Sequence, residues 1–447
     1  MNATERALAV VVLAAGEGTR MKSQRPKVLH EIAGRPLLAY PLGAAEALAP
    51  ARLLVVVGPA AEAVREALGD RADFVVQPEP RGTGDAVQRA LPSLGDFRGD
   101  VLILYGDTPL LRAETLRALR AKKAETRCDL VLLTSPAPLP GRVVRDASGR
   151  VARVVEVTDA TPEELAIQEG NTGVYLVDAE FLGKALAQLD DDNAQGELYL
   201  TDIVSYAVSQ QRSVEAMRLE DPDESLGVNT RAELAAAGAA VRRRVLAELM
   251  AEGVTIVDPE HTYVDVDVEV GRDTVIEPGC VLRGATRVGE RVTIKPHCVI
   301  ESSILEDDVT IGPSAHLRPG SRLGRGVRVG NFVEVKNSTL GAGVKADHLS
   351  YIGDADVGDG ASFGCGAITV NYDWEAKHRT RVGAGVRVGC NANLVAPVSL
   401  ADDSAVAAGT TVTRDVPADA LAVARERQRN VEGWRKRRSR PKKDSGS

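Results

Sequence analysis

The sequence predicts an α/β domain followed by a parallel β-helix made of hexapeptide repeats. The chain has 447 residues, more than one hydrophobic core usually serves, so at least two domains are expected. Short apolar runs alternate with helical stretches up to about residue 228. Beyond residue 252, aliphatic residues recur every six positions, which is typical of a solenoid of stacked coils.

The first domain is expected to span residues 1–228. Segments 8–15, 53–58, 101–107 and 130–135 are short, mostly apolar runs, as in strands that are buried on both faces. Stretches rich in Ala, Leu and Glu separate them. This alternation favours an α/β sheet of parallel strands.

A single helix is predicted over residues 229–252, between the two domains. Thr230 and Glu233 have the spacing of a capping box, which satisfies backbone N–H groups at the start of a helix. An apolar stripe follows from the helical period, and we expect it to pack against another part of the chain. Its members are Leu234, Val241, Val245 and Leu249.

The β-helix is expected to span residues 253–434, in about eight coils. Glycine often follows the aliphatic position, where a tight corner needs a residue without a Cβ. The aliphatic side chains then fill one narrow core, so a ligand must bind outside the coils or between copies of the chain. We therefore expect a closed oligomer, most simply a homotrimer, with sites where copies meet. The aliphatic positions are Val264, Val270, Ile276, Leu282, Val288, Ile294 and Ile300, then Ile311, Leu317, Leu323, Val329 and Val335, then Val382, Val388, Leu394, Leu400, Val406 and Val412.

The composition argues against several classes of protein. A formal net charge of −8 disfavours a main role in binding nucleic acid or acidic membranes. The one basic cluster lies in the terminal segment 435–447, which we expect to be disordered. Five cysteines without a CxxC pair favour reduced thiols. The chain shows neither an apolar leader nor a run of about 18 apolar residues, so we expect a soluble, cytoplasmic protein.

Two motifs in the first domain suggest a phosphate site and a metal site. The stretch LAVVVLAAGEGTRM, followed by RPKVLH, is a strand, a glycine-rich turn and then Arg20 and Lys27, whose charge would neutralise phosphate. It matches neither Walker A nor a dinucleotide fingerprint. In LYGDTPL, Asp107 follows a predicted strand, where open α/β sheets bind ligands, and its carboxylate suits a hard cation such as Mg²⁺. Taken singly, each motif is equally consistent with an ordinary turn.

His348, in KADHLSYIGDA, lies where the hexapeptide spacing breaks down. Corner residues of the repeat are committed to packing, so chemistry is expected at such breaks. Histidine titrates near neutral pH and can act as a general base toward an amine. Either Glu334 or Asp347 could orient its ring, and the sequence does not choose between them. The other histidines, which we interpret as structural or exposed, are His30, His261, His297, His316 and His378.

The complete set of motifs resembles the sugar-phosphate nucleotidyltransferases, because QPEPRGTGDA, VVEVTDA, EGNTGVY, NAQGELYLTD and GVNTRAE follow in that order. With the hexapeptide half, the chain resembles the bifunctional N-acetylglucosamine-1-phosphate uridyltransferase/glucosamine-1-phosphate N-acetyltransferase family over residues 8–434. The resemblance implies a Rossmann-like nucleotidyltransferase sheet and a left-handed β-helix. It also implies synthesis of UDP-N-acetylglucosamine, a precursor of peptidoglycan and lipopolysaccharide.

The implied reactions are acetyl transfer from acetyl-CoA to glucosamine 1-phosphate, then Mg²⁺-dependent uridylyl transfer from UTP to N-acetylglucosamine 1-phosphate with release of pyrophosphate. The partners would be these small molecules, with no nucleic acid and no membrane.

The resemblance implies site residues in the first domain. Arg20 and Lys27 would be catalytic, and Asp107 with Asn229 would hold Mg²⁺. The residues implied to contact UTP or UDP-N-acetylglucosamine are Leu13, Ala14, Ala15, Gly16, Lys27, Gln77, Gly82, Thr83, Tyr105, Gly106, Asp107, Gly141, Glu156, Asn171 and Asn229.

In the β-helix, the resemblance makes His348 the catalytic base. The residues implied to bind glucosamine 1-phosphate are Arg318, Glu334, Lys336, Tyr351, Ser362, Asn371 and Lys377. Those implied to bind acetyl-CoA are Cys365, Asn371, Tyr372, Cys390, Ala408 and Arg425.

Four positions depart from the family pattern. Asp85 stands where G-T-x-H-A commonly has histidine, and it adds a negative charge near the expected nucleotide. Ser362 and Cys365 replace Asn and Ala of N-x-G-A-G, and Cys390 replaces a Ser before LVAP. The last three border the expected amine and CoA sites, so acetyl transfer is the activity that they would affect.

Two alternatives stay open at this point. One is a nucleotidyltransferase of single activity whose β-helix only assembles the oligomer, and the residues around His348 count against it. The other is a nucleotide-sugar sensor or scaffold without activity. The pair Asp107 and Asn229 counts against that reading, because binding alone would not require a metal.

Overall fold

The computed structural model describes residues 6–59 and 61–435. Contacts within the chain divide it into two compact units, Met1–Val245 and Leu246–Ser447. The division falls inside helix α8 (Arg231–Ala251), which coincides closely with the predicted helix. The predicted domain limits at 228 and 252 flank this helix and stay predictions. Most of the basic segment 435–447 lies outside the described residues.

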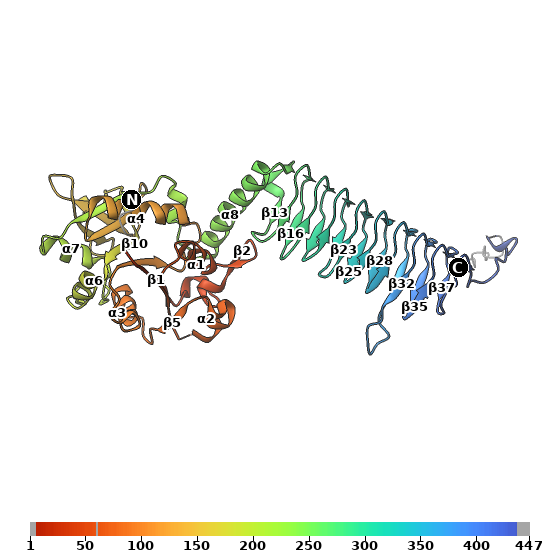
Figure 1. Cartoon of the computed structure of the whole chain (residues 1–447), viewed down its shortest axis with the longest axis horizontal. Coiled ribbons are helices and arrows are strands. Elements are labelled where there is room, and N and C mark those ends of the chain that lie inside the picture. The colour runs from red at the N-terminus through yellow and green to blue at the C-terminus, as the bar shows by residue number, and fades with distance from the viewer. Residues whose placement is uncertain (1–5, 60, 436–447) are drawn as a thin grey trace, which may run out of the picture. The chain divides into compact units, whose positions relative to one another are not determined.

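A nine-stranded sheet organises the first unit (Figure 1). The order along its main path is β11-β7-β10-β6-β1-β4-β5, and β8 and β9 pair beside β10. The predicted strands are confirmed as β1, β4, β6 and β7. The strand bounds are β1 Leu8–Ala14, β4 Arg52–Val57, β5 Asp73–Val76, β6 Asp100–Tyr105, β7 Leu130–Ser135, β8 Gly141–Arg145, β9 Val151–Glu156, β10 Gly170–Asp178 and β11 Val214–Arg218.

The prediction that all strands run parallel is wrong for part of this sheet. β1 is parallel to β4 and β6, but β10 is antiparallel to both β6 and β7. β8 and β9 form an antiparallel pair. A short connection joins β8 to β9, as antiparallel neighbours allow, whereas parallel neighbours need a long crossover.

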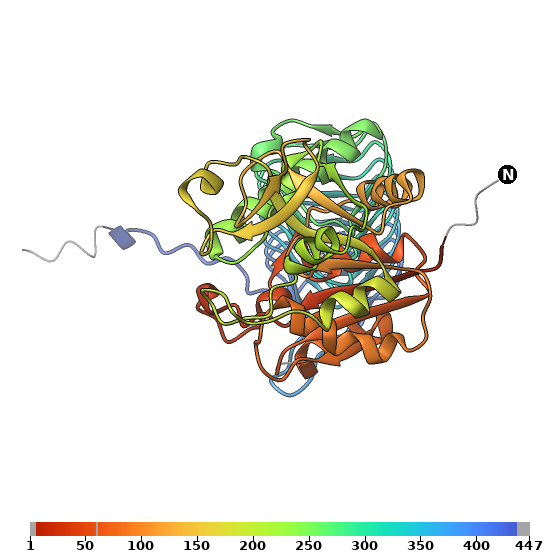
Figure 2. The ribbon, with the colours of Figure 1, turned by 90° about the vertical axis from the view of Figure 1, so that its left-hand side faces the viewer.

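Helices cover both faces of the sheet (Figure 2). Alternate residues of a strand point to opposite faces, so Val10 and Val12 of β1 join one core cluster and Val11 joins the other. The first cluster includes residues of α1 and α4, and the second includes residues of α3, α6 and α7. The helix bounds are α1 Ala39–Glu46, α2 Ala61–Leu68, α3 Thr83–Leu94, α4 Ala113–Thr126, α5 Pro162–Leu165, α6 Ala179–Leu186 and α7 Asp202–Ser209.

The predicted capping box of α8 is confirmed. Thr230 Oγ1 accepts from the Glu233 N–H at 3.2 Å, and Glu233 Oε2 accepts from the Thr230 N–H at 2.8 Å. Val241 and Leu249 of the predicted stripe are buried, and Leu234 is half-buried. The sequence therefore located both the start and the packed side of this helix.

The second unit is a parallel β-helix of three sheets, with ten, nine and eight strands. The ten-stranded sheet runs from β12 (Thr255–Ile256) to β38 (Leu421–Ala422). The nine-stranded sheet runs from β13 (Tyr263–Val264) to β37 (Thr411–Val412), and the eight-stranded sheet from β14 (Glu269–Val270) to β35 (Val398–Leu400). Every aliphatic position named from the spacing is buried, which confirms the repeat as the source of the core.

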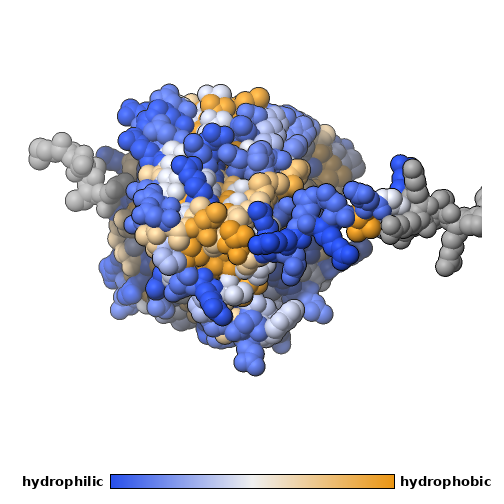
Figure 3. All heavy atoms as spheres, turned by 90° about the vertical axis from the view of Figure 1, so that its right-hand side faces the viewer, coloured by the Kyte–Doolittle hydropathy of each residue, from blue (hydrophilic) through white to orange (hydrophobic). Residues whose placement is uncertain are grey.

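One coil of the β-helix is longer than the others. A loop between β31 (Ile368–Val370) and β32 (Thr380–Val382) leaves the stack (Figure 1) and carries Trp374, 87% exposed. At the last coil, Leu421 and Val423 are exposed, and apolar atoms are visible at this end of the β-helix (Figure 3). Across the part of the chain that is described, no helix is both long and apolar enough to cross a membrane.

Candidate active sites

The carboxyl ends of β1 and β6 form the base of the first candidate site. The two strands are parallel neighbours, with Leu13 beside Tyr105, and the Gly106 N–H donates to the Leu13 carbonyl at 2.8 Å. The glycine-rich segment that follows Ala14 and the segment that carries Asp107 therefore leave the sheet at the same edge. This is the edge where open α/β sheets bind ligands.

Lys27, Asp107 and Asn229 come together from three distant segments. Lys27 lies in the short 3-10 helix η2 (Lys27–Leu29) and is buried. Its Nζ donates to Asp107 Oδ2 at 2.5 Å and to Asn229 Oδ1 at 2.9 Å. The backbone holds the last two together, because the Val228 N–H donates to the Asp107 carbonyl at 2.9 Å.

Gly18 permits this approach of Lys27. Its φ of 65° is in the left-handed region, and a Cβ added there would lie 2.6 Å from the Lys27 Cβ. A larger residue would push the lysine away from its two oxygen partners.

The oxygen atoms of Asp107 and Asn229 fit a divalent cation. Both point to one position that already accommodates a positive charge, the Lys27 ammonium. One carboxylate and one amide oxygen suit Mg²⁺, which commonly binds one or two protein oxygens and completes its shell with substrate phosphates and water. The protein could therefore hold Mg²⁺ through these two residues.

Arg20 lies nearby, in the 3-10 helix η1 (Thr19–Met21), and its charge reaches Glu233. Partial burial opposes ionisation of Glu233. Hydrogen bonds from Asn229 and Thr230, together with the charge of Arg20, outweigh it and lower the pKa of Glu233. The same carboxylate accepts from the Asn229 N–H at 2.7 Å, so the cap of α8 also anchors a predicted metal ligand.

The residues expected to contact the amino sugar lie on adjacent strands. Gly141 pairs with Glu156 on one side and with Asn171 on the other. Asn171 donates to the Tyr175 hydroxyl at 2.7 Å. Burial raises the pKa of Glu156, and burial with the nearby charge of Glu156 raises the pKa of Tyr105.

The nucleotide-side residues gather at the start of α3. Gln77 directly follows β5, and Gly82 precedes the helix with a φ of 102°. Gln77 Nε2 donates to Asp85 Oδ2 at 2.8 Å and to the Gly82 carbonyl at 3.1 Å. Arg89 Nε donates to Asp85 Oδ1 at 3.2 Å. The family departure at Asp85 is thus a buried carboxylate with two side-chain partners and not an unpaired charge.

His348 begins the second candidate site, at the end of β27 (Lys345–His348). Asn331, at the end of β24 (Arg328–Asn331), is its register partner in the preceding coil. The side-chain Oδ1 of Asn331 lies 3.0 Å from His348 Nδ1. An amide oxygen only accepts, so Nδ1 donates the proton and the Nε2 lone pair is left for a substrate.

The expectation that Glu334 or Asp347 orients the ring is wrong. Glu334 pairs with Arg318 at 2.9 Å, and Asp347 pairs with Arg328 at 3.1 Å. Sequence reasoning missed Asn331 although a signal was present. Asn331 precedes His348 by 17 positions, which is one coil.

The expected CoA residues follow His348 in a column along the β-helix. Ala346 pairs with Phe363, Phe363 with Val388, and Val388 with Val406. The residues two positions further on therefore occupy equivalent places in successive coils, and these are His348, Cys365, Cys390 and Ala408. Arg425 donates to the Ala408 carbonyl at 2.5 Å, and Ser362 pairs with Lys345 in the same sheet.

Glu334, Lys336 and Tyr351 of the expected sugar-phosphate residues lie on the nine-stranded sheet. Arg318 and Asn371 directly follow strands of this sheet, and Lys377 lies in the loop between β31 and β32. Glu334 pairs with Tyr351, and Asn371 donates to the Tyr351 hydroxyl at 3.5 Å and to Asp354. Lys377 lowers the pKa of Lys336, with smaller contributions from desolvation and Arg318. A lysine whose pKa is lowered by neighbouring cations marks a place where an anion would be stabilised. Tyr372 lies in the exposed loop, where its hydroxyl donates to the Trp374 carbonyl.

Four of the five other histidines have side-chain partners. His30 is close to Arg231, His261 to Asp258, His316 to Glu301 and His378 to Asp373.

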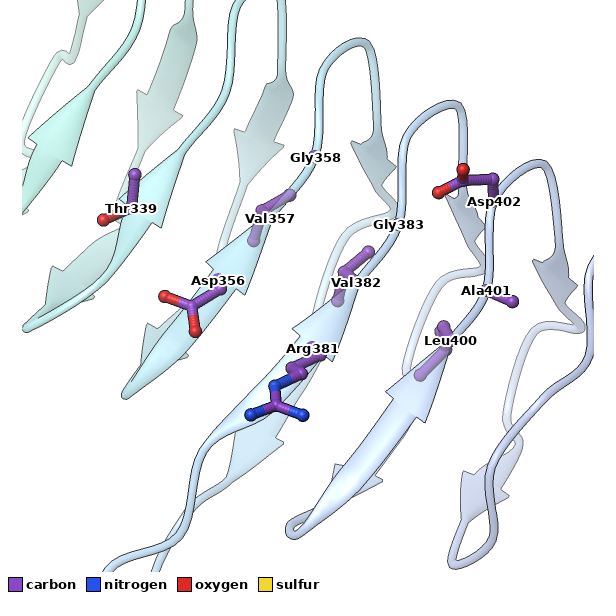
Figure 4. A pocket seen from close by; sticks show the side chains of 10 residues that line it. All are labelled: Thr339, Asp356, Val357, Gly358, Arg381, Val382, Gly383, Leu400, Ala401 and Asp402. Atoms are coloured by element: carbon purple, nitrogen blue, oxygen red, sulfur yellow. The ribbon is translucent and has the colours of Figure 1, made fainter.

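A separate hollow of about 600 Å³ opens on the eight-stranded sheet (Figure 4). It is lined by Asp356, Arg381 and Asp402 among others, and it contains no residue predicted for either site. Asp356 pairs with Arg379, and Asp402 accepts the Ala384 N–H.

Known proteins match both domains. Residues 10–196 match the MobA-like NTP transferase domain, and residues 267–302 and 302–337 match the bacterial transferase hexapeptide (six repeats).

Relatives align over nearly their whole length. The bifunctional protein GlmU of Trichlorobacter lovleyi is 48% identical over 95% of this chain and 97% of the relative. That of Geobacillus sp. is 46% identical over 95% and 96%. That of Streptococcus agalactiae is 42% identical over 95% and 96%. The chain therefore belongs to the family of bifunctional GlmU proteins.

Proposed function

We propose that the first domain transfers a uridylyl group from UTP to N-acetylglucosamine 1-phosphate, and that the β-helix acetylates glucosamine 1-phosphate with acetyl-CoA. Membership of the GlmU family supports both activities. The observation that carries uridylyl transfer is the meeting of Lys27, Asp107 and Asn229 at the carboxyl edge of the sheet. The observation that favours acetyl transfer is the oriented ring of His348.

Uridylyl transfer needs positioning and charge neutralisation more than a protein base. The sugar 1-phosphate is an anionic nucleophile, and its oxygen attacks the α-phosphorus of UTP in line while pyrophosphate leaves. Lys27 and Arg20 would donate to the phosphates and offset their repulsion. Mg²⁺ on Asp107 and Asn229 would neutralise further charge on the triphosphate.

Acetyl transfer needs a base, because a protonated amine cannot attack a thioester. His348 Nε2 would take the proton as the amine nitrogen bonds to the acetyl carbonyl carbon, and the CoA thiolate would leave. The cations Arg318, Lys336 and Lys377 would hold the sugar phosphate.

The two parts of this acetyl site lie on different sheets of one β-helix. His348 is on the ten-stranded sheet, whereas Lys336 is on the nine-stranded sheet. Arg318 directly follows a strand of the nine-stranded sheet, and Lys377 lies in the loop between β31 and β32. Hexapeptide repeats favour assembly of several copies. We propose a homotrimer in which a second copy closes each acetyl pocket.

Two assays on one protein preparation test the assignment. Acetyl transfer is followed as free CoA thiol, and uridylyl transfer as pyrophosphate. His348→Ala is expected to abolish thiol release and to leave pyrophosphate release unchanged, because the two sites lie in separate units. His261→Ala, which alters an exposed histidine paired with Asp258, is the matched control. Normal thiol release by His348→Ala, or loss of both activities, would contradict the assignment.

Metal removal tests the other site. Chelation is expected to stop pyrophosphate release and added Mg²⁺ to restore it, while thiol release continues. Equal sensitivity of the two activities to chelation would count against the pair Asp107 and Asn229 as the metal site.

A further inference from the structure

We propose that Asp85 sets the base specificity of the first domain by fixing the orientation of the Gln77 side-chain amide. The inference rests on the proposed uridylyl transfer. The family resemblance implies that Gln77 contacts the nucleotide, and the inference assigns that contact to the base. Asp85 would be a positioning residue, because it acts through Gln77.

Asp85 is a charged residue that is 3% exposed, so its carboxylate requires compensation. Three features supply it. Gln77 donates to one oxygen at 2.8 Å, and Arg89 donates to the other at 3.2 Å. The carboxylate also lies in the first turn of α3, where the helix dipole favours negative charge. A buried carboxylate with this support is held in one place.

The orientation of the Gln77 amide follows from its partners. The amide has two N–H donors on Nε2 and one acceptor, Oε1. Nε2 donates to Asp85 Oδ2 and to the Gly82 carbonyl, which lies at 3.1 Å. Both partners only accept, so turning the amide over would place Oε1 against two acceptors. The group left to meet a ligand is therefore Oε1.

A fixed acceptor discriminates between pyrimidines. Uracil presents an N3–H donor between its two carbonyl groups, whereas cytosine presents an unprotonated N3, which is an acceptor. Oε1 of Gln77 can accept from the uracil N3–H but would oppose the lone pair of cytosine N3. A buried polar group that loses its partner rejects the wrong ligand strongly. The site is thus built for a base with an N–H at this position.

The test compares UTP with CTP in the full-length protein, with N-acetylglucosamine 1-phosphate as acceptor. Pyrophosphate release gives kcat/KM for each nucleotide. In Asp85→Asn, the new side chain can offer Gln77 either a donor or an acceptor, so an amide that turns over is opposed by the Gly82 carbonyl alone and no longer by two acceptors. The ratio of kcat/KM for UTP to that for CTP is expected to fall on the order of tenfold. Asp85→Ser offers the same choice through a hydroxyl and should lower the ratio in the same direction.

Glu114→Gln is the matched control, because it removes an exposed carboxylate from the first turn of another helix, α4. It should keep the unaltered ratio, and thermal melting reports whether each variant is folded. An unchanged ratio in both Asp85 variants, or an equal loss with both nucleotides, would overturn the proposal. Failure of the unaltered protein to release pyrophosphate from any nucleotide would instead refute uridylyl transfer itself.

Discussion

His348 depends on a residue one coil away for the position of its proton. Asn331 Oδ1 lies 3.0 Å from Nδ1 and requires the proton on that nitrogen. In a β-helix, a partner of this kind is supplied by stacking and not by proximity in sequence, since successive coils place equivalent residues side by side.

Asn331→Asp should shift the pH dependence of acetyl transfer. A carboxylate beside the ring stabilises the imidazolium, so a higher pH is needed to generate the neutral base. The lower limb of the pH profile for thiol release is expected to move up by about one unit. Pyrophosphate release serves as the internal control and should keep its profile. A profile that does not move would mean that Asn331 does not contact the ring during catalysis.

Lys27 provides a test at the other site. Lys27→Met removes the ammonium that lies between Asp107 and Asn229 and should lower kcat/KM for UTP by about a hundredfold. Thiol release should be unaffected. Lys22→Met, a change at an exposed lysine nearby, is the control. A similar loss in both variants would mean that activity depends on the total positive charge of this region and not on the position of Lys27.

At the scale of elements, helix α8 links the fold to the first site. Its capping box satisfies backbone groups at the helix start, and the same Glu233 accepts from the Asn229 N–H. A defect in the cap should therefore be felt both in stability and at the predicted metal ligand.

Thr230→Ala removes the hydroxyl that accepts a hydrogen bond from the backbone N–H of Glu233. The free energy of unfolding is expected to fall by about 1 kcal/mol, measured by urea denaturation. The Mg²⁺ concentration needed for half-maximal pyrophosphate release should rise, because Asn229 is less well held. Loss of stability without any change in the Mg²⁺ requirement would mean that the helix cap stabilises the fold but does not hold Asn229 for the metal.

The sequence predicted the elements better than the contacts between them. Spacing of six fixed the core of the β-helix because every coil repeats one corner environment, as Ile294 and Leu317 show. The apolar run of β1 was equally clear. The direction of β10 was missed because alternation of strands and helices does not encode pairing direction. Asn331 was missed because side-chain pairs across coils depend on register, which a local motif does not display.

At the scale of the whole molecule, the two chemistries belong to two compact units with separate cores. The proposed acetyl site needs a neighbouring copy, whereas the residues of the proposed uridylyl site all come from one unit. The two activities should therefore respond differently to the state of assembly.

Dilution should separate them. If copies dissociate at low concentration, specific thiol release falls while specific pyrophosphate release stays constant. Light scattering at the same concentrations gives the mass of the assembly and should report three copies where acetyl transfer is full. Full acetyl transfer by a species with the mass of one chain would refute the shared pocket.

The loop between β31 and β32 has a wider consequence. Lys345 pairs with Ser362, whereas Ser362 pairs with Arg387, so the chain gains several residues there and still returns to register. Phe363 and Val388 on either side of the gain remain buried in the same stack. An extra residue inside a strand would move every later side chain of that strand to the opposite face of the sheet. At this corner, additional residues leave the buried positions of the next coil unchanged. This corner is therefore a position where a binding segment can be inserted or lengthened while the stacked coils keep their structure.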